Sequence, residues 1–106
     1  MIRMGVIGCG YWGPNLIRNF HNNAEVEVVA IADTDQSRLD QVGRLYPGAT
    51  RHHDHRDLVK DASIDAVVVA TPVSTHFPIG LEVLEAGKHL FVEKPMAASM
   101  EECRRL

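Results

Sequence analysis

The chain has 106 residues, enough for a single domain with its own core, and we treat residues 1–106 as that domain. Its net charge of -3 gives no basic field to attract a nucleic acid, and no apolar run approaches the roughly 20 residues that cross a bilayer. An apolar segment begins at residue 2, which leaves no room for a secretory signal, and two cysteines are too few for a disulfide framework. We therefore expect a cytoplasmic protein without nucleic-acid or membrane partners.

Strand-like and helix-like segments alternate along the chain. The patterns predict strands at 2–7, 26–32, near 49–51, 66–70 and 89–92. They predict helices at 14–22, from a cap at Thr34 or Asp35 to about Tyr46, from Asp57, at 75–86, and after a capping-box pattern at Ser99 and Glu102. The fourth strand shows no polar alternation, as expected where both faces of a parallel sheet are covered. We therefore predict a doubly wound parallel sheet in the order 3-2-1-4-5, in a three-layer α/β/α arrangement.

The sequence stops at Leu106, soon after the helix start predicted at Ser99. We interpret the chain as the N-terminal part of a larger enzyme, with a sixth strand and a substrate domain missing; a final helix that frays is the alternative. Without a sixth strand, residues 89–92 form an apolar edge, opposite the charged stretch 52–56. We therefore expect a homo-oligomer that associates through this edge or the face beside it.

A glycine-rich turn follows the first predicted strand: Gly8-Cys9-Gly10-Tyr11-Trp12-Gly13. Gly8 permits a tight turn, Gly10 lets a pyrophosphate approach the backbone, and Gly13 lets the next helix lie close to the strand. The start of that helix directs unpaired N–H groups at the anion. Asp33 ends the second strand, at the position that binds a ribose 2′-hydroxyl of NAD. The spacing predicts dinucleotide binding; a glycine-rich turn without a ligand is the alternative.

The charges after the second strand favour NAD over NADP. The carboxylate of Asp33 repels a 2′-phosphate, and Asp35 adds a second negative charge. Arg38 has two interpretations, because its guanidinium can bind a phosphate or pair with Asp35 at the i, i+3 spacing of a helix. We expect NAD as the cofactor.

Three segments together carry a family resemblance: residues 5–13, then Ala70-Thr71-Pro72 with His76, then Gly87-Lys88-His89-Leu90-Phe91-Val92-Glu93-Lys94-Pro95. They resemble the Gfo/Idh/MocA oxidoreductases, whose N-terminal domain is an NAD-binding Rossmann domain. The sequence Tyr11-Trp12-Gly13-Pro14-Asn15 is similar to that of family members that act on sugars or nucleotide sugars. The resemblance implies an NAD-dependent dehydrogenase that transfers hydride between NAD and a hydroxyl carbon of a sugar, nucleotide sugar or cyclitol. It also implies a second, substrate-binding domain, so we expect the 106 residues alone to be inactive.

The resemblance implies that Lys94 is catalytic, because the family's lysine lies between the nicotinamide and the substrate hydroxyl. A cation there stabilises a developing alkoxide and can relay a proton; a solvated charge at a strand end is the alternative. A cis bond before Pro95 is a further implication. The cofactor-binding residues expected from the motif and the resemblance are Gly8, Gly10, Tyr11, Trp12, Gly13, Asp33, Thr71, Pro72, His76, Glu93 and Lys94. Family members often have asparagine where this chain has Val73, and His76 has the alternative role of bonding nearby backbone.

Other candidate groups have structural interpretations. The segment His52-His53-Asp54-His55 lacks the spacing of a zinc site, so we expect a polar, solvated strand edge and no metal. Cys9 lies near a helix start, which can lower a thiol pKa, but a small residue tolerated in the turn is the simpler account. Two functional alternatives remain: a stand-alone, non-catalytic NAD(H)-binding module, and a methyltransferase-like domain that binds S-adenosylmethionine. The three spaced glycines and Glu93-Lys94-Pro95 count against the latter.

Overall fold

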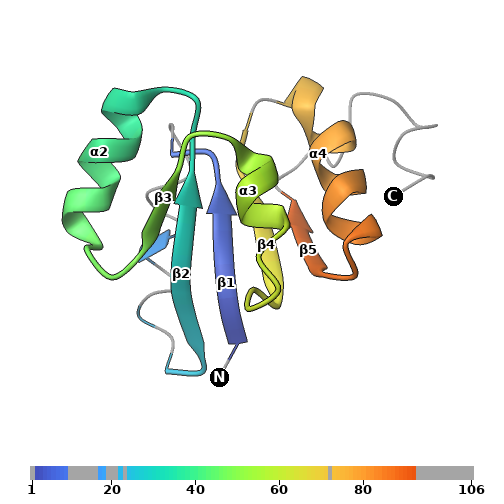
Figure 1. Ribbon diagram of the computed structural model, residues 1–106, viewed down its shortest axis with the longest axis horizontal. Coiled ribbons are helices and arrows are strands. Elements are labelled where there is room, and N and C mark those ends of the chain that lie inside the picture. The colour runs from blue at the N-terminus through green and yellow to red at the C-terminus, as the bar shows by residue number, and fades with distance from the viewer. Residues whose placement is uncertain (1, 10–16, 19–21, 23, 72, 93–106) are drawn as a thin grey trace.

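The computed structural model describes residues 2–9, 17–18, 22, 24–71 and 73–92, and Figure 1 draws the others as a thin trace. Within the described part, strands and helices alternate as predicted. Their order is β1 Ile2–Ile7, β2 Val26–Ala32, α2 Gln36–Leu45, β3 Thr50–His52, α3 His55–Val59, β4 Ala66–Val69, α4 Val73–Glu85 and β5 His89–Val92. Residues 17–18 are helical, and the amide of Asn22 donates to the carbonyl of Arg18 at 3.1 Å. The rest of the helix predicted at 14–22, and everything predicted after residue 92, lie outside the described residues.

The five strands form one sheet in the order β3-β2-β1-β4-β5, and every neighbouring pair is parallel. This confirms the predicted doubly wound topology. β1 lies at the centre, with Val6 paired to Ile31 of β2 on one side and to Val68 of β4 on the other. All strands therefore end at the same edge of the sheet, which is the upper edge in Figure 1. Ligands of doubly wound sheets bind outside this carboxyl edge.

Each face of the sheet has its own hydrophobic cluster, because side chains alternate along the strands. In β1, Val6 joins one cluster and Ile7 the other. The first cluster is covered by α2 and the segment at Ile17: Met4, Val6, Cys9, Ile17, Val28, Ile31, Leu39, Val42, Ala49 and Val68. The second is covered by α3 and α4: Ile7, Ala30, Ala32, Leu58, Val59, Ile64, Val67, Val69, Ile79 and Val83. Two covered faces confirm the three-layer arrangement (Figure 1).

Helix capping explains where the structure differs from the predicted boundaries. Asp35 caps α2, accepting from the amides of Ser37 and Arg38, which decides between the two predicted caps. Asp54 caps α3 by accepting from the amide of Arg56, so this helix begins at His55 rather than at Asp57. The predicted start was wrong because the capping aspartate was assigned to a strand edge.

The end of α4 is fixed by a glycine cap, as predicted for Gly87. Gly87 has a φ of 79°, and its amide donates to the carbonyl of Leu84, while the amide of Lys88 donates to that of Val83. These two bonds form a Schellman motif, which satisfies the last carbonyls of the helix. The helix runs from Val73 to Glu85, slightly displaced from the predicted 75–86.

β3 and β4 also differ slightly from their predicted bounds. β3 covers Thr50–His52 rather than 49–51, because Ala49 instead donates its amide to the carbonyl of Tyr46 at 3.0 Å and lies buried. β4 ends at Val69 rather than at residue 70.

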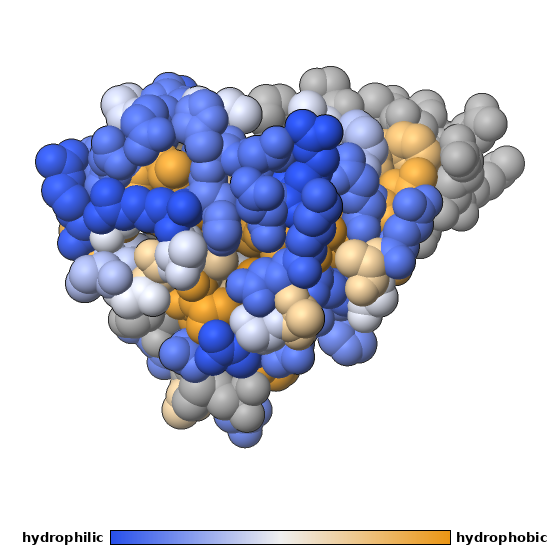
Figure 2. Space-filling model, viewed as in Figure 1, coloured by the Kyte–Doolittle hydropathy of each residue, from blue (hydrophilic) through white to orange (hydrophobic). Residues whose placement is uncertain are grey.

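The surface seen in Figure 2 is largely hydrophilic over α2 and α3, with smaller apolar patches between them and toward α4. β5 lies at one edge of the described sheet, and Phe91 on it is 48% exposed. Self-association through this edge stays a prediction. None of the described helices combines the length and the apolar character that crossing a membrane requires.

Candidate functional site

The turn after β1 requires glycine at Gly8 for two reasons. Its φ of 103° lies in the region that side-chain-bearing residues rarely adopt. A Cβ at this position would also lie 2.8 Å from the carbonyl carbon of Ala70 and 3.0 Å from the amide nitrogen of Thr71. The amide of Gly8 donates to the carbonyl of Ala32 at 2.8 Å. The turn is therefore pressed between the ends of β2 and β4, at the centre of the carboxyl edge.

Asp33 lies beside this turn and is held by the segments that follow β1 and β2 and by the end of β3. One carboxylate oxygen, Oδ2, accepts from the amide of Cys9 at 2.7 Å, and the other, Oδ1, accepts from the amide of Asp35 at 2.8 Å. The amide of Asp33 donates to the carbonyl of His52 at the end of β3. A carboxylate has about four lone-pair sites, so these bonds leave acceptor capacity for a ligand's hydroxyls. The acid expected from the sequence is thus brought against the glycine turn.

Cys9 is a structural residue of the turn rather than a reactive thiol. Its side chain is buried, and its sulfur lies 3.9 Å from the carbonyl of Ala32. Burial, with a smaller contribution from the charge of Asp33, raises the pKa of the Cys9 thiol to about 12. The pKa is thus raised, and the lowering that a helix start can produce is absent here. Cys9 is best explained as a small residue that the turn accommodates.

The end of β4 is fixed by side chains from the first turn of α4. Nε2 of the buried His76 lies 2.7 Å from the carbonyl oxygen of Thr71. The hydroxyl of Thr75 donates to the hydroxyl of Thr71 at 2.6 Å. The structure thus places Thr71 beside the glycine turn, and His76 makes the backbone contact that was one of its two predicted roles.

The charges after β2 are arranged as an internal pair. Nε of Arg38 lies 3.7 Å from Oδ2 of Asp35, at the predicted i, i+3 spacing. The Asp35 carboxylate also accepts from the hydroxyl and amide of Ser37 and the amide of Arg38. Hydrogen bonding from the Ser37 hydroxyl, the largest cause, lowers the pKa of Asp35. Arg38 therefore has an acidic partner in this structure.

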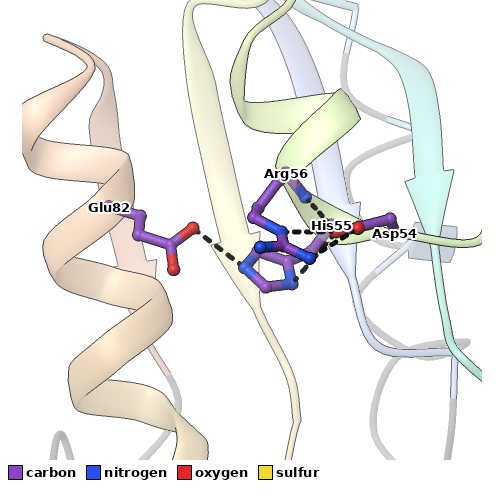
Figure 3. A network of polar contacts seen from close by, with 4 residues as sticks. All are labelled: Asp54, His55, Arg56 and Glu82. Atoms are coloured by element: carbon purple, nitrogen blue, oxygen red, sulfur yellow. Dashed lines mark hydrogen bonds and ion pairs between the residues drawn. The ribbon is translucent and has the colours of Figure 1, made fainter.

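The histidine-rich segment 52–55 is not the solvated strand edge that we predicted. Only His52 belongs to β3, because Asp54 caps α3 and draws His55 into the helix. Nε2 of His55 lies 2.9 Å from Oε2 of Glu82, and Asp54 binds the guanidinium of Arg56 at 2.9 Å. Figure 3 shows His55 between this Asp54–Arg56 pair and Glu82 of α4. The segment links α3 to α4 on one face of the sheet.

Seven of the predicted site residues lie outside the described part of the chain: Gly10, Tyr11, Trp12, Gly13, Pro72, Glu93 and Lys94. Gly8, Asp33, Thr71 and His76 are described, and the structure brings them to the carboxyl edge of β1, β2 and β4. Sequence reasoning missed Thr75. Its spacing of four residues from Thr71, across the entry to a helix, is the signal that would have indicated this contact.

Comparison with known proteins decides the family. The family model described as "Oxidoreductase family, NAD-binding Rossmann fold" (Gfo/Idh/MocA) matches residues 2–106. The chain belongs to this family. Its dinucleotide-binding Rossmann domain is therefore what these residues form, as the resemblance predicted.

Three relatives illustrate the family's range. A "glycosyl hydrolase family 109 protein" of Shewanella baltica is 38% identical over 97% of this chain and 24% of its own length. Myo-inositol dehydrogenase from Lactobacillus casei, solved with NAD(H) and myo-inositol, superposes with a TM-score of 0.93 at 33% identity, over 99% of this chain and 32% of its own. KijD10, a 3-ketoreductase from Actinomadura kijaniata solved with NADP and TDP-benzene, superposes with a TM-score of 0.91 at 28% identity. The superposition covers 98% of this chain and 32% of KijD10. The chain thus spans about a quarter to a third of these proteins' lengths.

Proposed function

We propose that this domain binds NAD in preference to NADP and serves an enzyme that transfers hydride to or from a hydroxyl carbon of a sugar, nucleotide sugar or cyclitol. The observation that carries the proposal is the position of Asp33. Its carboxylate is held 2.7 Å from the amide of Cys9, directly beside the positive-φ turn at Gly8. An acid after the second strand and a glycine turn after the first bind the two ends of an adenosine diphosphate group.

Charge supports the preference for NAD. The Asp33 carboxylate accepts hydrogen bonds from two ribose hydroxyls but repels the doubly charged 2′-phosphate of NADP. Arg38, the nearby cation of α2, is paired with Asp35 at 3.7 Å and thus has its charge offset. Relatives differ in this respect, since myo-inositol dehydrogenase was solved with NAD(H) and KijD10 with NADP.

The cofactor preference is tested by calorimetric titration with NAD and NADP. We expect NAD to bind at least about tenfold more tightly, a difference of about 1.4 kcal/mol. Asp33→Ala should narrow this ratio, because it removes both the hydroxyl acceptor and the repulsive charge. Asp57→Ala removes an exposed acid on α3 and serves as the matched control. Equal affinities for NAD and NADP in the unmutated chain would contradict the preference.

For hydride transfer we assign the catalytic role to Lys94, on the strength of the Glu93-Lys94-Pro95 resemblance. When bound, NAD supplies the hydride acceptor at its nicotinamide ring. A lysine ammonium beside the substrate oxygen stabilises the alkoxide that develops as hydride leaves. In the full-length protein, Lys94→Ala should lower kcat strongly while leaving NAD affinity within about twofold, and Lys94→Arg keeps the charge as a control.

The assay is NADH formation from a panel of sugars, nucleotide sugars and inositols. Net NADH formation supports a dehydrogenase. Cleavage of a glycoside without net NADH formation would instead match the name of the Shewanella baltica relative. NAD binding with neither reaction would favour the alternative, a non-catalytic NAD(H)-binding module. We place the enzyme in the cytoplasm, where the free thiol of Cys9 stays reduced.

A further inference from the structure

His76 is a polar side chain that the fold buries. It is 2% exposed, and Nε2 lies 2.7 Å from the carbonyl oxygen of Thr71. A carbonyl oxygen only accepts hydrogen bonds, so Nε2 carries the proton in this contact. Burying an imidazole is costly unless it is bonded, and here the bond is directed at the backbone where β4 ends. His76 therefore acts on the position of Thr71.

Thr71 is held at two of its groups, because its carbonyl accepts from His76 and its hydroxyl accepts from Thr75 at 2.6 Å. Its amide nitrogen lies close to the Gly8 turn, 3.0 Å from the position that a Cβ on Gly8 would take. Because the Thr71 hydroxyl accepts from Thr75, it keeps its own proton to donate elsewhere. The geometry thus presents one oriented hydroxyl donor at the carboxyl edge of the sheet.

The order of the strands relates this donor to a dinucleotide. Asp33 follows β2, the Gly8 turn follows β1, and Thr71 follows β4, and these strands are consecutive neighbours in the sheet. In this fold the acid binds the adenosine ribose and the glycine turn binds the pyrophosphate. A dinucleotide laid across the edge in that direction has its nicotinamide half over the end of β4, beside Thr71.

We propose that His76 is a positioning residue for the nicotinamide half of the cofactor. It holds the Thr71 carbonyl, so that the Thr71 hydroxyl, oriented by Thr75, donates to the nicotinamide riboside. The inference rests on the proposed dinucleotide binding and assigns the two halves of the cofactor to different residues. Asp33 holds the adenosine half, and the His76–Thr71–Thr75 group holds the other half.

The test compares two ligands, NADH and ADP, by equilibrium titration of the full chain. ADP contains the adenosine and both phosphates but no nicotinamide riboside. His76→Leu keeps the side-chain volume and removes the donor; we expect it to weaken NADH binding about tenfold and ADP binding less than twofold. His76→Gln carries an amide N–H at a similar reach and should restore NADH affinity to within about threefold. His89→Gln changes an exposed histidine at the opposite end of the sheet and should change neither affinity.

Thr75→Val gives a second route if His76→Leu does not fold. It removes the hydroxyl that orients Thr71 at nearly constant volume, and we expect NADH binding to weaken about threefold with ADP binding unchanged. Equal weakening of NADH and ADP by either variant would overturn the inference, because the residues would then support the fold alone. Unchanged NADH affinity in a folded His76→Leu protein would also overturn it. Failure of the unmutated chain to bind NADH or ADP would instead overturn the proposed function, and this inference with it.

Discussion

Substituting Gly8 by alanine tests the close packing of the turn against β4. Two costs apply at this position. A residue with a side chain at a φ of 103° is strained by about 1–3 kcal/mol. The added methyl group would also lie 2.8 Å from the carbonyl carbon and 2.9 Å from the carbonyl oxygen of Ala70. Because these are backbone atoms, the strand end must move, and overpacking of this kind costs about 1–3 kcal/mol more.

Two other glycines separate these costs. Gly87 has a φ of 79°, but an added Cβ would meet no atom within 4 Å, so Gly87→Ala carries the conformational cost alone. Gly48 has open space and no positive φ, so Gly48→Ala should be neutral or slightly stabilising. We therefore expect the free energy of unfolding, measured in urea, to fall by about 2–6 kcal/mol for Gly8→Ala and by about 1–3 kcal/mol for Gly87→Ala. A loss for Gly8→Ala no greater than that for Gly87→Ala would refute the steric part of the reasoning.

Two further predictions concern side chains on the α3 and α4 face of the sheet. Hydrogen bonding from Arg56 lowers the pKa of Asp54 from 3.8 to about 2, so its contribution to stability is complete above pH 4 and is lost as the pH falls through about 2. The difference in unfolding midpoint between the unmutated chain and Asp54→Asn, measured by circular dichroism, should therefore be constant above pH 4 and shrink below it; a difference independent of pH would contradict this. Lys88 donates from Nζ to the carbonyls of Asp61 at 2.7 Å and Ile64 at 2.8 Å. Lys88→Met should therefore lower the free energy of unfolding in urea by about 2 kcal/mol. The control Lys60→Met, at an exposed lysine in the same region, should change it by no more than about 0.5 kcal/mol.

The sheet was predictable because its signals are local and strong. The uninterrupted apolar run of β4 indicates a strand covered on both faces, and Gly87 indicates the end of α4 without reference to any tertiary contact. The start of α3 was not predictable in the same way. Asp54 can belong to a polar edge or cap a helix, and the fold uses the cap, in which Asp54 accepts from the amide of Arg56 and His55 contacts Glu82, far along the chain.

The candidate site was predictable as a set of residue types and not as a set of contacts. Gly8 and Asp33 were identified from their spacing, but the spacing does not say that the Asp33 carboxylate accepts from the amide of Cys9. Likewise, the sequence left His76 between a cofactor contact and a backbone contact, since a helix-entry histidine serves either. Such bonds depend on how the strand ends align, and that alignment is a tertiary property.

The central place of β1 has a consequence for how the site comes into being. Of the five strands described, β1 is synthesised before the others, yet it pairs with β2 and with β4, which begins only at Ala66. The turn at Gly8 therefore has one of its walls, the Ala70–Thr71 peptide, only after some sixty further residues have left the ribosome. Contacts so distant in sequence form slowly, because a long loop must close before they contribute stability. A nascent chain that already carries the whole glycine motif and Asp33 thus has no finished binding site, and cofactor can begin to stabilise the domain only when β4 has joined the sheet.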